Sequence, residues 1–332
     1  MVGSLFSSMW TQFFPPNPIF TEKNVPDLTD KVYLVTGANT GVGKQLARLL
    51  YSKNAKAYIA ARSEGKANEA IRDIRESHPS SSGALIFLHI DLNDLSSVKA
   101  SAERFLSIET KLHVLFNNAG VQNLNKGANT VQGYEQHLGI NTIAPFLFTK
   151  LLTPILAKTA RPEMLTPGSV RVIWVSSQAI ELSGIKSVGL DINNLDYHDD
   201  ASDITKYALS KVGNWLHGVE YAKRHKADGI ISIPLNPGNI ASDLYRENKN
   251  MGIGIIIKLV GHPPIDGAYT ELYAGLSLDI TIEKTGSWVI PFGRIAEIRK
   301  DLQEATRSES EGGNGNAAKF WDWTEEQVKQ YT

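Results

Sequence analysis

The chain has 332 residues, and its 34 lysines and arginines are nearly balanced by 35 acidic residues, giving a formal net charge of −1. This length allows one large α/β domain or two small ones, and charge spread evenly without a basic run excludes a nucleic-acid-binding protein. Cysteine is absent, which excludes disulfides, thiol catalysis and cysteine-ligated zinc and fits a reducing, cytoplasmic setting.

The first 30 residues are interpreted as an N-terminal arm. Its apolar residues recur at helical spacing and end at the Pro15-Pro16 break. They are Val2, Leu5, Phe6, Met9, Trp10, Phe13 and Phe14. The first basic residue is Lys23, so the arm lacks the positive start of a signal peptide. We favour a short helix packed on its own domain over a membrane-surface contact. No apolar run is long enough to span a bilayer, so no transmembrane segment is expected.

From Lys31 onward, short apolar runs alternate with helical patterns. The predicted strands are Val32–Val35, Ala57–Ala61, Leu85–Ile90, Leu112–Phe116, Val170–Val175, Ile230–Ile233 and Ser287–Phe292. Continuous apolar runs, rather than alternating ones, indicate strands that are buried on both faces. The pattern predicts an α/β fold of the Rossmann type, a doubly wound, mostly parallel sheet of about seven strands with helices on both faces.

The alternation is interrupted in two places. Residues 178–203 are too many for a simple loop between a strand and a helix, and residues from about 242 to 264 take the position of a substrate lid. A segment rich in Ser, Glu, Gly and Asn at 308–316 is typical of a flexible linker, and helical spacing follows it. The chain is therefore divided into an arm at 1–30, a single Rossmann-type domain at 31–305, and a linker with a C-terminal helix at 306–332.

A glycine-rich turn follows the first predicted strand and opens a helix. It contains Gly37, Thr40, Gly41, Val42 and Gly43. Glycine permits the tight turn and lets the backbone approach a pyrophosphate, and the helix N-terminus offers N–H groups to that anion. We interpret the turn as a cofactor-binding loop rather than a purely structural one.

Three other strand ends carry candidate cofactor contacts. Arg62 follows the second strand, where enzymes that use NAD usually place an acid, and it can pair with a 2′-phosphate, with Lys66 nearby. We therefore expect NADP(H), although Arg62 could instead be a solvated surface residue. Asp91, after the third strand, can accept from the adenine amino group or cap a helix. Asn118, after the fourth, belongs to a stretch of small residues that lets the backbone run close to the cofactor.

Tyr207 and Lys211 are four residues apart and share one helical face. Tyr245 and Lys249 have the same spacing, but Tyr207 lies where the helix after the fifth strand should begin, so the second pair is taken as coincidence. A tyrosine pKa is ordinarily near 10, and a nearby ammonium brings it toward neutral, as a proton relay requires.

Two polar residues complete the candidate catalytic group. Ser177 ends the fifth strand and can hydrogen-bond a substrate oxygen. Asn141 can hold a water that links Lys211 to solvent. The eight histidines show no paired ligand spacing, so no metal site is expected.

In their order along the chain, these residues resemble the short-chain dehydrogenase/reductases, from about Lys31 to Arg294. The matching elements are Thr36–Gly43, Asp91-Leu92, Asn117–Gly120, Asn141, Ser177, Tyr207-x-x-x-Lys211 and Pro237-Gly238. The resemblance implies that Tyr207 donates the proton in reduction, Lys211 lowers the tyrosine pKa and holds the nicotinamide ribose, and Ser177 binds the reacting oxygen. It also implies that Asn141 completes the relay and that Gly238 flanks the nicotinamide.

Finer features are similar to the fungal members of the retinol-dehydrogenase-like branch. These are Ala61-Arg62, Leu190–Leu195, Asn236–Asn239, Gly267–Glu271 and Phe320–Trp323. The resemblance implies an NADP(H)-dependent oxidoreductase that reduces ketones or aldehydes or oxidises alcohols on a mostly apolar small molecule, such as a secondary metabolite.

The alternative is a catalytically silent NADP(H)-binding sensor or scaffold, although such relatives usually lose the tyrosine or lysine that this chain keeps. A nucleotide-sugar epimerase or dehydratase is disfavoured because its glycine spacing differs. The sequence leaves a homo-oligomer open and does not name the substrate.

Overall fold

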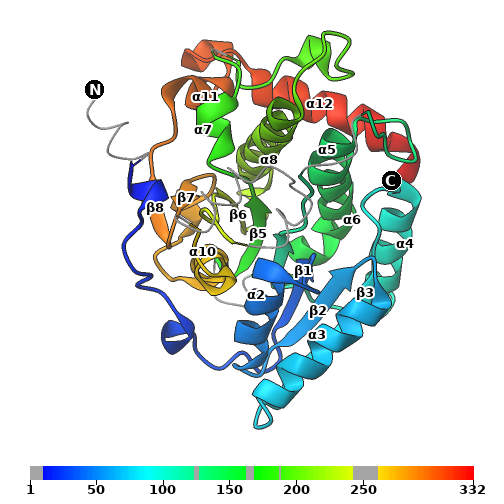
Figure 1. Ribbon diagram of the computed structural model, residues 1–332, viewed down its shortest axis with the longest axis vertical. Coiled ribbons are helices and arrows are strands. Elements are labelled where there is room, and N and C mark those ends of the chain that lie inside the picture. Colours follow the sequence, from blue (N-terminus) through cyan, green and yellow to red (C-terminus); the bar gives the residue numbers. More distant parts are fainter. Residues whose placement is uncertain (1–9, 123–126, 162–167, 187, 242–260) are drawn as a thin grey trace.

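The computed structural model describes residues 10–122, 127–161, 168–186, 188–241 and 261–332. At its centre lies an eight-stranded sheet in the order β3-β2-β1-β4-β5-β6-β7-β8 (Figure 1). The strands are β1 (Val32–Thr36), β2 (Lys56–Ala61), β3 (Ala84–His89), β4 (Val114–Asn117), β5 (Val170–Val175), β6 (Ile230–Leu235), β7 (Trp288–Ile290) and β8 (Arg294–Ala296). Neighbouring strands from β3 to β7 pair in parallel, and β8 pairs antiparallel to β7.

The predicted doubly wound, mostly parallel α/β fold is confirmed, with one correction to its edge. The single strand expected at Ser287–Phe292 is β7, followed by a turn and an eighth strand, β8. Gly293 adopts a φ of +80° in that turn, which reverses the chain. The residues of β8 are only partly buried or exposed, so no apolar run marked this strand in the sequence.

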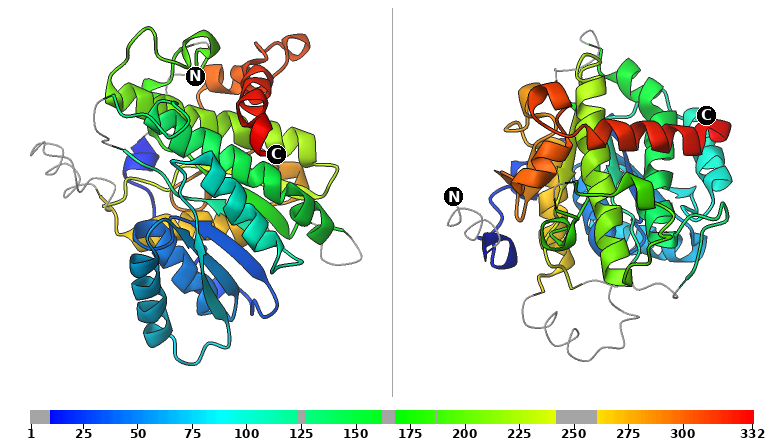
Figure 2. Two further views of the ribbon diagram at one scale, coloured as in Figure 1. Left: turned by 90° about the vertical axis from the view of Figure 1, so that its right-hand side faces the viewer. Right: turned by 90° about the horizontal axis from the view of Figure 1, so that it is seen from above.

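Helices cover both faces of the sheet (Figure 2). One face carries α2 (Gly41–Tyr51), α3 (Glu64–Ser77) and α10 (Pro264–Leu276), and the other carries α4 (Leu95–Leu106), α6 (Ala144–Thr159) and α8 (Asp203–His225). Every residue of β1, β4, β5 and β6 is buried, as expected for parallel strands packed between two helical layers. The strand order reverses between β1 and β4, which is where open α/β sheets bind their ligands.

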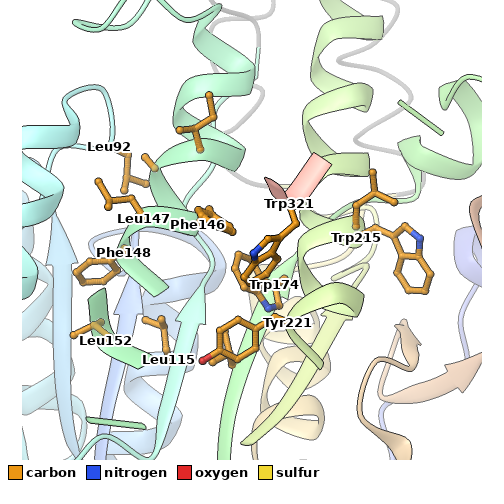
Figure 3. Packing of buried hydrophobic residues seen from close by; sticks show 14 of the residues in the cluster. Leu92, Leu115, Phe146, Leu147, Phe148, Leu152, Trp174, Trp215, Tyr221 and Trp321 are labelled. Atoms are coloured by element: carbon orange, nitrogen blue, oxygen red, sulfur yellow. The ribbon is translucent and has the colours of Figure 1, made fainter. Parts of the chain in front are cut away.

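Two helices close the end of the chain, α11 (Lys300–Ala305) and α12 (Asn316–Val328). Figure 3 shows Trp321 of α12 directed toward Phe146 and Trp174. The rings of Trp321 and Phe146 meet edge to face with centroids 4.7 Å apart. The guanidinium of Arg224, on α8, lies 4.9 Å from the Trp321 ring centroid. The C-terminal helix is thereby packed on the face that α6 and α8 form.

The connection to α12 was expected to be a flexible linker, and the structure corrects this. Residues 309–311 form a 3₁₀ turn that a capping box of Ser308 and Glu311 closes. The Asn316 side-chain amide donates to the carbonyls of Val188 and Leu190, each at 2.6 Å. Polar side chains that resemble a linker in composition here serve as local caps.

A continuous helical stretch precedes β5. It joins α5 (Gln136–Leu138), a π-helical turn η2 (Gly139–Ile143) and α6. By length and composition this stretch, Gln136–Thr159, could cross a membrane, contrary to the expectation that no apolar run is long enough. Within its most apolar window, 67% is buried inside the fold, so packing beneath the sheet accounts for its apolar character.

The described part of the N-terminal arm begins with a helical turn at residues 10–13. The sequence predicted that an apolar face would pack on the domain. Instead, Trp10 and Phe14 are 61% and 50% exposed, while the polar Gln12 is fully buried. Phe13 is half-buried, and the other predicted face residues, Val2, Leu5, Phe6 and Met9, lie outside the described residues. Gln12 anchors this turn through hydrogen bonds, while Phe20, Val25 and Leu28 pack the rest of the arm against a core cluster that includes residues of α2 and α10.

Candidate active site

The glycine-rich turn between β1 and α2 has the geometry expected of a phosphate-binding loop. Gly37 and Gly41 adopt φ angles of +68° and +57°, a region that favours glycine. Thr40 is the N-cap residue of α2, so the first N–H groups of this helix point toward the loop, with Val42 and Gly43 in its first turn. A Cβ at Gly43 would lie 2.8 Å from the Gly37 carbonyl oxygen, which explains why glycine is needed there.

Asn118 supports this loop through its side chain, a role that the sequence analysis did not identify. Its Nδ2 donates to the Thr36 carbonyl at 2.7 Å. The backbone N–H of Ala119 also donates to Thr36 Oγ1, at 3.0 Å. The loop after β4 therefore fixes the loop after β1. Only the position of an amide side chain just after a buried strand could have indicated this in the sequence.

The carboxyl end of β2 presents cationic side chains. Arg62 and Lys66 are both exposed, beside the N-terminus of α3. The side chain of Ser63 caps α3 by accepting from the Lys66 N–H. Lys44 lies nearby in the sequence, but its Nζ is 2.6 Å from Asp73 Oδ2. Arg62 and Lys66 are thus the cations best placed for an anionic ligand at this end.

Asp91 follows β3, and its carboxylate has a structural partner. Its Oδ1 accepts from the Asn93 N–H at 3.0 Å, and the Asp91 N–H donates to Ser97 Oγ at 3.0 Å. These bonds form the turn into α4, whose N-cap residue is Asp94. The second carboxylate oxygen of Asp91 can still accept from a ligand, so both interpretations of this residue stand.

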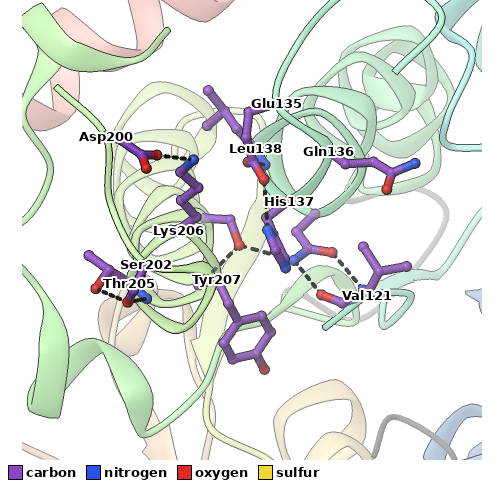
Figure 4. A network of polar contacts seen from close by, with 12 residues as sticks. Val121, Glu135, Gln136, His137, Leu138, Asp200, Ser202, Thr205, Lys206 and Tyr207 are labelled. Carbon is purple, nitrogen blue, oxygen red and sulfur yellow. Dashed lines mark hydrogen bonds and ion pairs between the residues drawn. The ribbon is translucent and has the colours of Figure 1, made fainter. Parts of the chain in front are cut away.

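Tyr207 and Lys211 lie one turn apart near the start of α8, as the spacing predicted. Both are buried, with exposures of 7% and 4%. Lys211 Nζ lies 5.9 Å from the Tyr207 ring centroid and donates to the Val175 carbonyl at 2.9 Å. Figure 4 shows the Tyr207 ring directed away from Glu135. The end of β5 therefore holds the ammonium beside the phenol.

Asn141 lies in the π-helical turn and is fully buried. Its amide is held on both sides, because Oδ1 accepts from the Val121 N–H at 2.7 Å while Nδ2 donates to Val121 O and Ser210 Oγ, both at 3.0 Å. A Cβ at Gly120 would lie 3.0 Å from Lys211 Nζ and 3.4 Å from Asn141 Oδ1. The structure thus places Asn141 and Lys211 together beside Gly120.

A buried carboxyl near Lys211 was missed by the sequence analysis. Glu271, on α10, is fully buried, and no described residue hydrogen-bonds its carboxylate oxygens. Burial raises the pKa of Glu271 to about 8, while the charge of Lys211 acts in the opposite direction. Burial likewise lowers the pKa of Lys211 to about 8. The sequence signal that could have indicated this buried carboxyl is an acidic residue on the sheet-facing side of an otherwise apolar helix.

Ser177 and Gly238 lie in the loops that follow the neighbouring strands β5 and β6. Ser177 is partly buried, and its Oγ accepts from the Ala179 N–H at 3.2 Å. Gly238 has a φ of +107°, and its N–H donates to Asn236 Oδ1 at 3.0 Å. Asn239 Nδ2 lies 3.4 Å from Gln178 Oε1, which joins the two loops. The fifth- and sixth-strand residues are therefore brought to one edge of the sheet.

Part of the predicted substrate end is not described. Residues 242–260, which contain most of the predicted lid and the Tyr245/Lys249 pair, lie outside the described residues. A cavity of about 240 Å³ lies between α6, α8 and α12, lined in part by Phe146, Trp174 and Trp321. None of the candidate catalytic residues lines it, so it is separate from the site.

The residues at this edge fit a dinucleotide cofactor. The glycine turn offers helix N–H groups to a pyrophosphate, the exposed Arg62 and Lys66 offer charge for a further phosphate, and Gly238 keeps the end of β6 free of a side chain. The buried Lys211 lies within reach of the same edge. No group of three or more metal-ligating side chains occurs among the described residues.

Comparison with known proteins gives consistent matches. The sequence model of the family described as short chain dehydrogenase matches residues 31–188. A short-chain dehydrogenase/reductase of Phomopsis amygdali is 54% identical, with 100% of each chain covered. Another, from Neocamarosporium betae, is 52% identical and covers 98% of this chain and 94% of the relative. Among solved structures, a protein of Mycobacterium paratuberculosis has 26% identity and a TM-score of 0.67, covering 93% and 97% of the two chains.

Proposed function

Because the chain belongs to the short-chain dehydrogenase/reductase family, we propose that it is an NADP(H)-dependent oxidoreductase that interconverts a carbonyl and a hydroxyl group on a mostly apolar organic substrate. The observation that carries the proposal is the pairing of Tyr207 with Lys211, whose ammonium lies 5.9 Å from the phenol ring beneath the end of β5. A sensor that no longer turns over would still use Lys211 to hold the nicotinamide ribose, but it would have no need for the Tyr207 hydroxyl beside that ammonium.

In the reductive direction, a bound nicotinamide would supply hydride to the carbonyl carbon. The Tyr207 hydroxyl gives its proton to the oxygen on which negative charge develops. The Lys211 ammonium stabilises the phenolate that remains, which lowers the phenol pKa. Ser177 Oγ donates a hydrogen bond to the reacting oxygen and orients it. Asn141, whose amide is fixed by Val121 and Ser210, would hold a water that links Lys211 to solvent.

The preference for NADP(H) over NAD(H) rests on the end of β2, where Ala61 stands at the usual acid position and Arg62 is exposed. A substrate from secondary metabolism, such as a polyketide or terpenoid ketone, is proposed from the resemblance of the sequence to fungal members of the retinol-dehydrogenase-like branch. A cytoplasmic location and a homo-oligomer remain predictions from the sequence.

The test is NADPH oxidation with a panel of apolar ketones, followed by single-turnover rates. We expect Tyr207→Phe to keep NADPH affinity within about threefold, because the ring and the cofactor contacts remain. Its rate should fall by about 10² to 10⁴. Tyr221→Phe is the matched control, since it removes a buried hydroxyl from the same helix. A rate kept by Tyr207→Phe would refute the assignment, and tight NADPH binding without oxidation would favour the sensor.

A further inference from the structure

The fully buried Gln12 makes two side-chain hydrogen bonds to distant parts of the chain. Its Nε2 donates to Glu181 Oε2 at 2.8 Å. Its Oε1 accepts from Asn236 Nδ2 at 2.9 Å. Arg294 Nη2 donates to the neighbouring Thr11 carbonyl at 2.7 Å, so the backbone of this turn is held as well. A single amide from the N-terminal arm thus joins α7 (Ala179–Ser183) to the end of β6.

Each partner of Gln12 is tied to a candidate site residue. Glu181 belongs to α7, and the first residue of α7, Ala179, donates its N–H to Ser177 Oγ. Asn236 uses its Oδ1 to accept from the Gly238 N–H at 3.0 Å. Gln12 therefore lies two hydrogen bonds from Gly238 and one short helix from Ser177.

We propose that Gln12 is a positioning residue, whose amide clamps the loop that carries Ser177 to the turn that carries Gly238 and so sets the geometry of the substrate end of the site. The inference rests on the proposed function for its catalytic consequence. The clamp leaves the glycine turn, Arg62 and Asn118 untouched, because those residues are fixed within the β1–β4 part of the sheet.

The energetics favour a specific role over simple packing. Glu181 is 6% exposed and Asn236 is 2% exposed, and burial raises the pKa of Glu181. Without Gln12, the Glu181 carboxylate and the Asn236 amide N–H would each lose one buried hydrogen bond, which is costly.

The experiment compares Gln12→Met with Gln12→Ala in the full chain. Methionine keeps the length and volume of glutamine but makes neither hydrogen bond. We expect kcat/KM for an accepted ketone to fall about tenfold or more in both variants, with the NADPH Kd within about twofold of the parent. Amide hydrogen exchange should accelerate about tenfold in α7 and at Gly238, and remain unchanged in the glycine turn.

Trp10→Ala is the matched control, because Trp10 lies in the same helical turn and is 61% exposed; it should change none of these values. Equal losses in NADPH affinity and ketone turnover would indicate a merely structural role and overturn the proposal. Unchanged kcat/KM in Gln12→Met would do the same. If the parent reduced no carbonyl, the proposed function would fail. Amide hydrogen exchange alone would then test the proposed clamp, and unchanged exchange in Gln12→Met would refute it.

Discussion

The two halves of the sheet edge hold their loops in different ways. The loops after β1 and β4 support each other directly, through the Asn118 side chain and the Thr36 hydroxyl. The loops after β5 and β6 share the contact of Asn239 with Gln178 and are also bridged by Gln12, which lies 169 residues from Glu181 and 224 from Asn236 in the sequence. Arg299 also donates to the carbonyls of Glu181 and Gly184.

This difference suggests a division of labour. The cofactor half is assembled from one contiguous stretch of chain, as a reusable nucleotide-binding unit would be. The substrate half is tied to remote segments at both ends of the chain, so its geometry can change without altering the cofactor half. Substitutions in the two halves should therefore produce separable effects on stability, cofactor affinity and turnover.

The largest expected effect concerns Glu271, which couples α10 to Lys211. The folded-state pKa of about 8 exceeds the ordinary value of 4.5. Between these pH values the folded protein keeps a proton that the unfolded chain releases, so stability falls as pH rises from about 4.5 to about 8. Glu271→Gln should remove this fall and stabilise the protein at pH 8 by a few kcal/mol, as measured by urea unfolding across this range.

Glu220 supplies the control for that experiment, because it is also buried but accepts from Arg224 Nε at 2.9 Å. Glu220→Gln breaks an ion pair and should lower stability at pH 8. Two results would contradict this prediction: a parent whose stability stayed constant from pH 5 to 8, or a Glu271→Gln variant less stable than the parent at pH 8. Either would show that ionisation of Glu271 does not destabilise the fold.

The second prediction tests the cofactor half at its outer end. Arg62→Ala should weaken NADPH binding about ten- to a hundredfold, because charge-assisted bonds to the 2′-phosphate are lost. NADH, which lacks that phosphate, should bind within about threefold of the parent. Calorimetric titration of both cofactors measures the ratio, with Arg72→Ala, on the exposed face of α3, as control. Equal weakening of both cofactors would remove Arg62 from the phosphate site.

Comparison of the two halves also shows what the sequence could predict. The β1 turn was predictable because glycines between a buried strand and a helix have few other uses, and the spacing of Tyr207 and Lys211 fixed their common face. Both features are local. Strand β8 was missed because its residues are poorly buried, and the linker at 308–316 was misjudged because capping residues and flexible residues share a composition.

The remaining misses depended on contacts between distant residues. Gln12 is polar in an apolar segment, and nothing in its neighbourhood predicts partners near the ends of β5 and β6. The sequence marks Glu271 only as part of a family motif. Its burial depends on how α10 packs on the sheet, which the local sequence does not show. The pairing of Asn118 with Thr36 requires β1 and β4 to be neighbours, which strand order alone determines.

The third prediction distinguishes two roles within the cofactor half: support of the glycine turn by Asn118 and recognition of the 2′-phosphate by Arg62. Asn118→Ala removes the bond to the Thr36 carbonyl and so loosens the glycine turn. Since that turn would hold the pyrophosphate common to both cofactors, NADPH and NADH should each bind about three- to tenfold more weakly. Their ratio should stay at the parental value, unlike in Arg62→Ala. A changed ratio would mean that Asn118 acts on the adenosine end instead.

The smallest expected effect is on NADPH affinity when the N-terminal arm is shortened. It is the sharpest test of whether the two halves act independently. Deleting residues 1–14 removes Gln12 together with the rest of the described helical turn. Glu181 and Asn236 lose a partner, so thermal stability and ketone turnover should fall, as in Gln12→Ala. The cofactor half keeps the contacts that hold the glycine turn, because these are made by Thr36, Asn118 and Ala119. The truncated protein should therefore remain folded and bind NADPH within about twofold of the parent.

Circular dichroism and calorimetric titration at one temperature, well below both melting points, make the comparison. Loss of NADPH binding with the fold retained would show that the arm belongs to the cofactor site, and the two halves would then have to be treated as one unit.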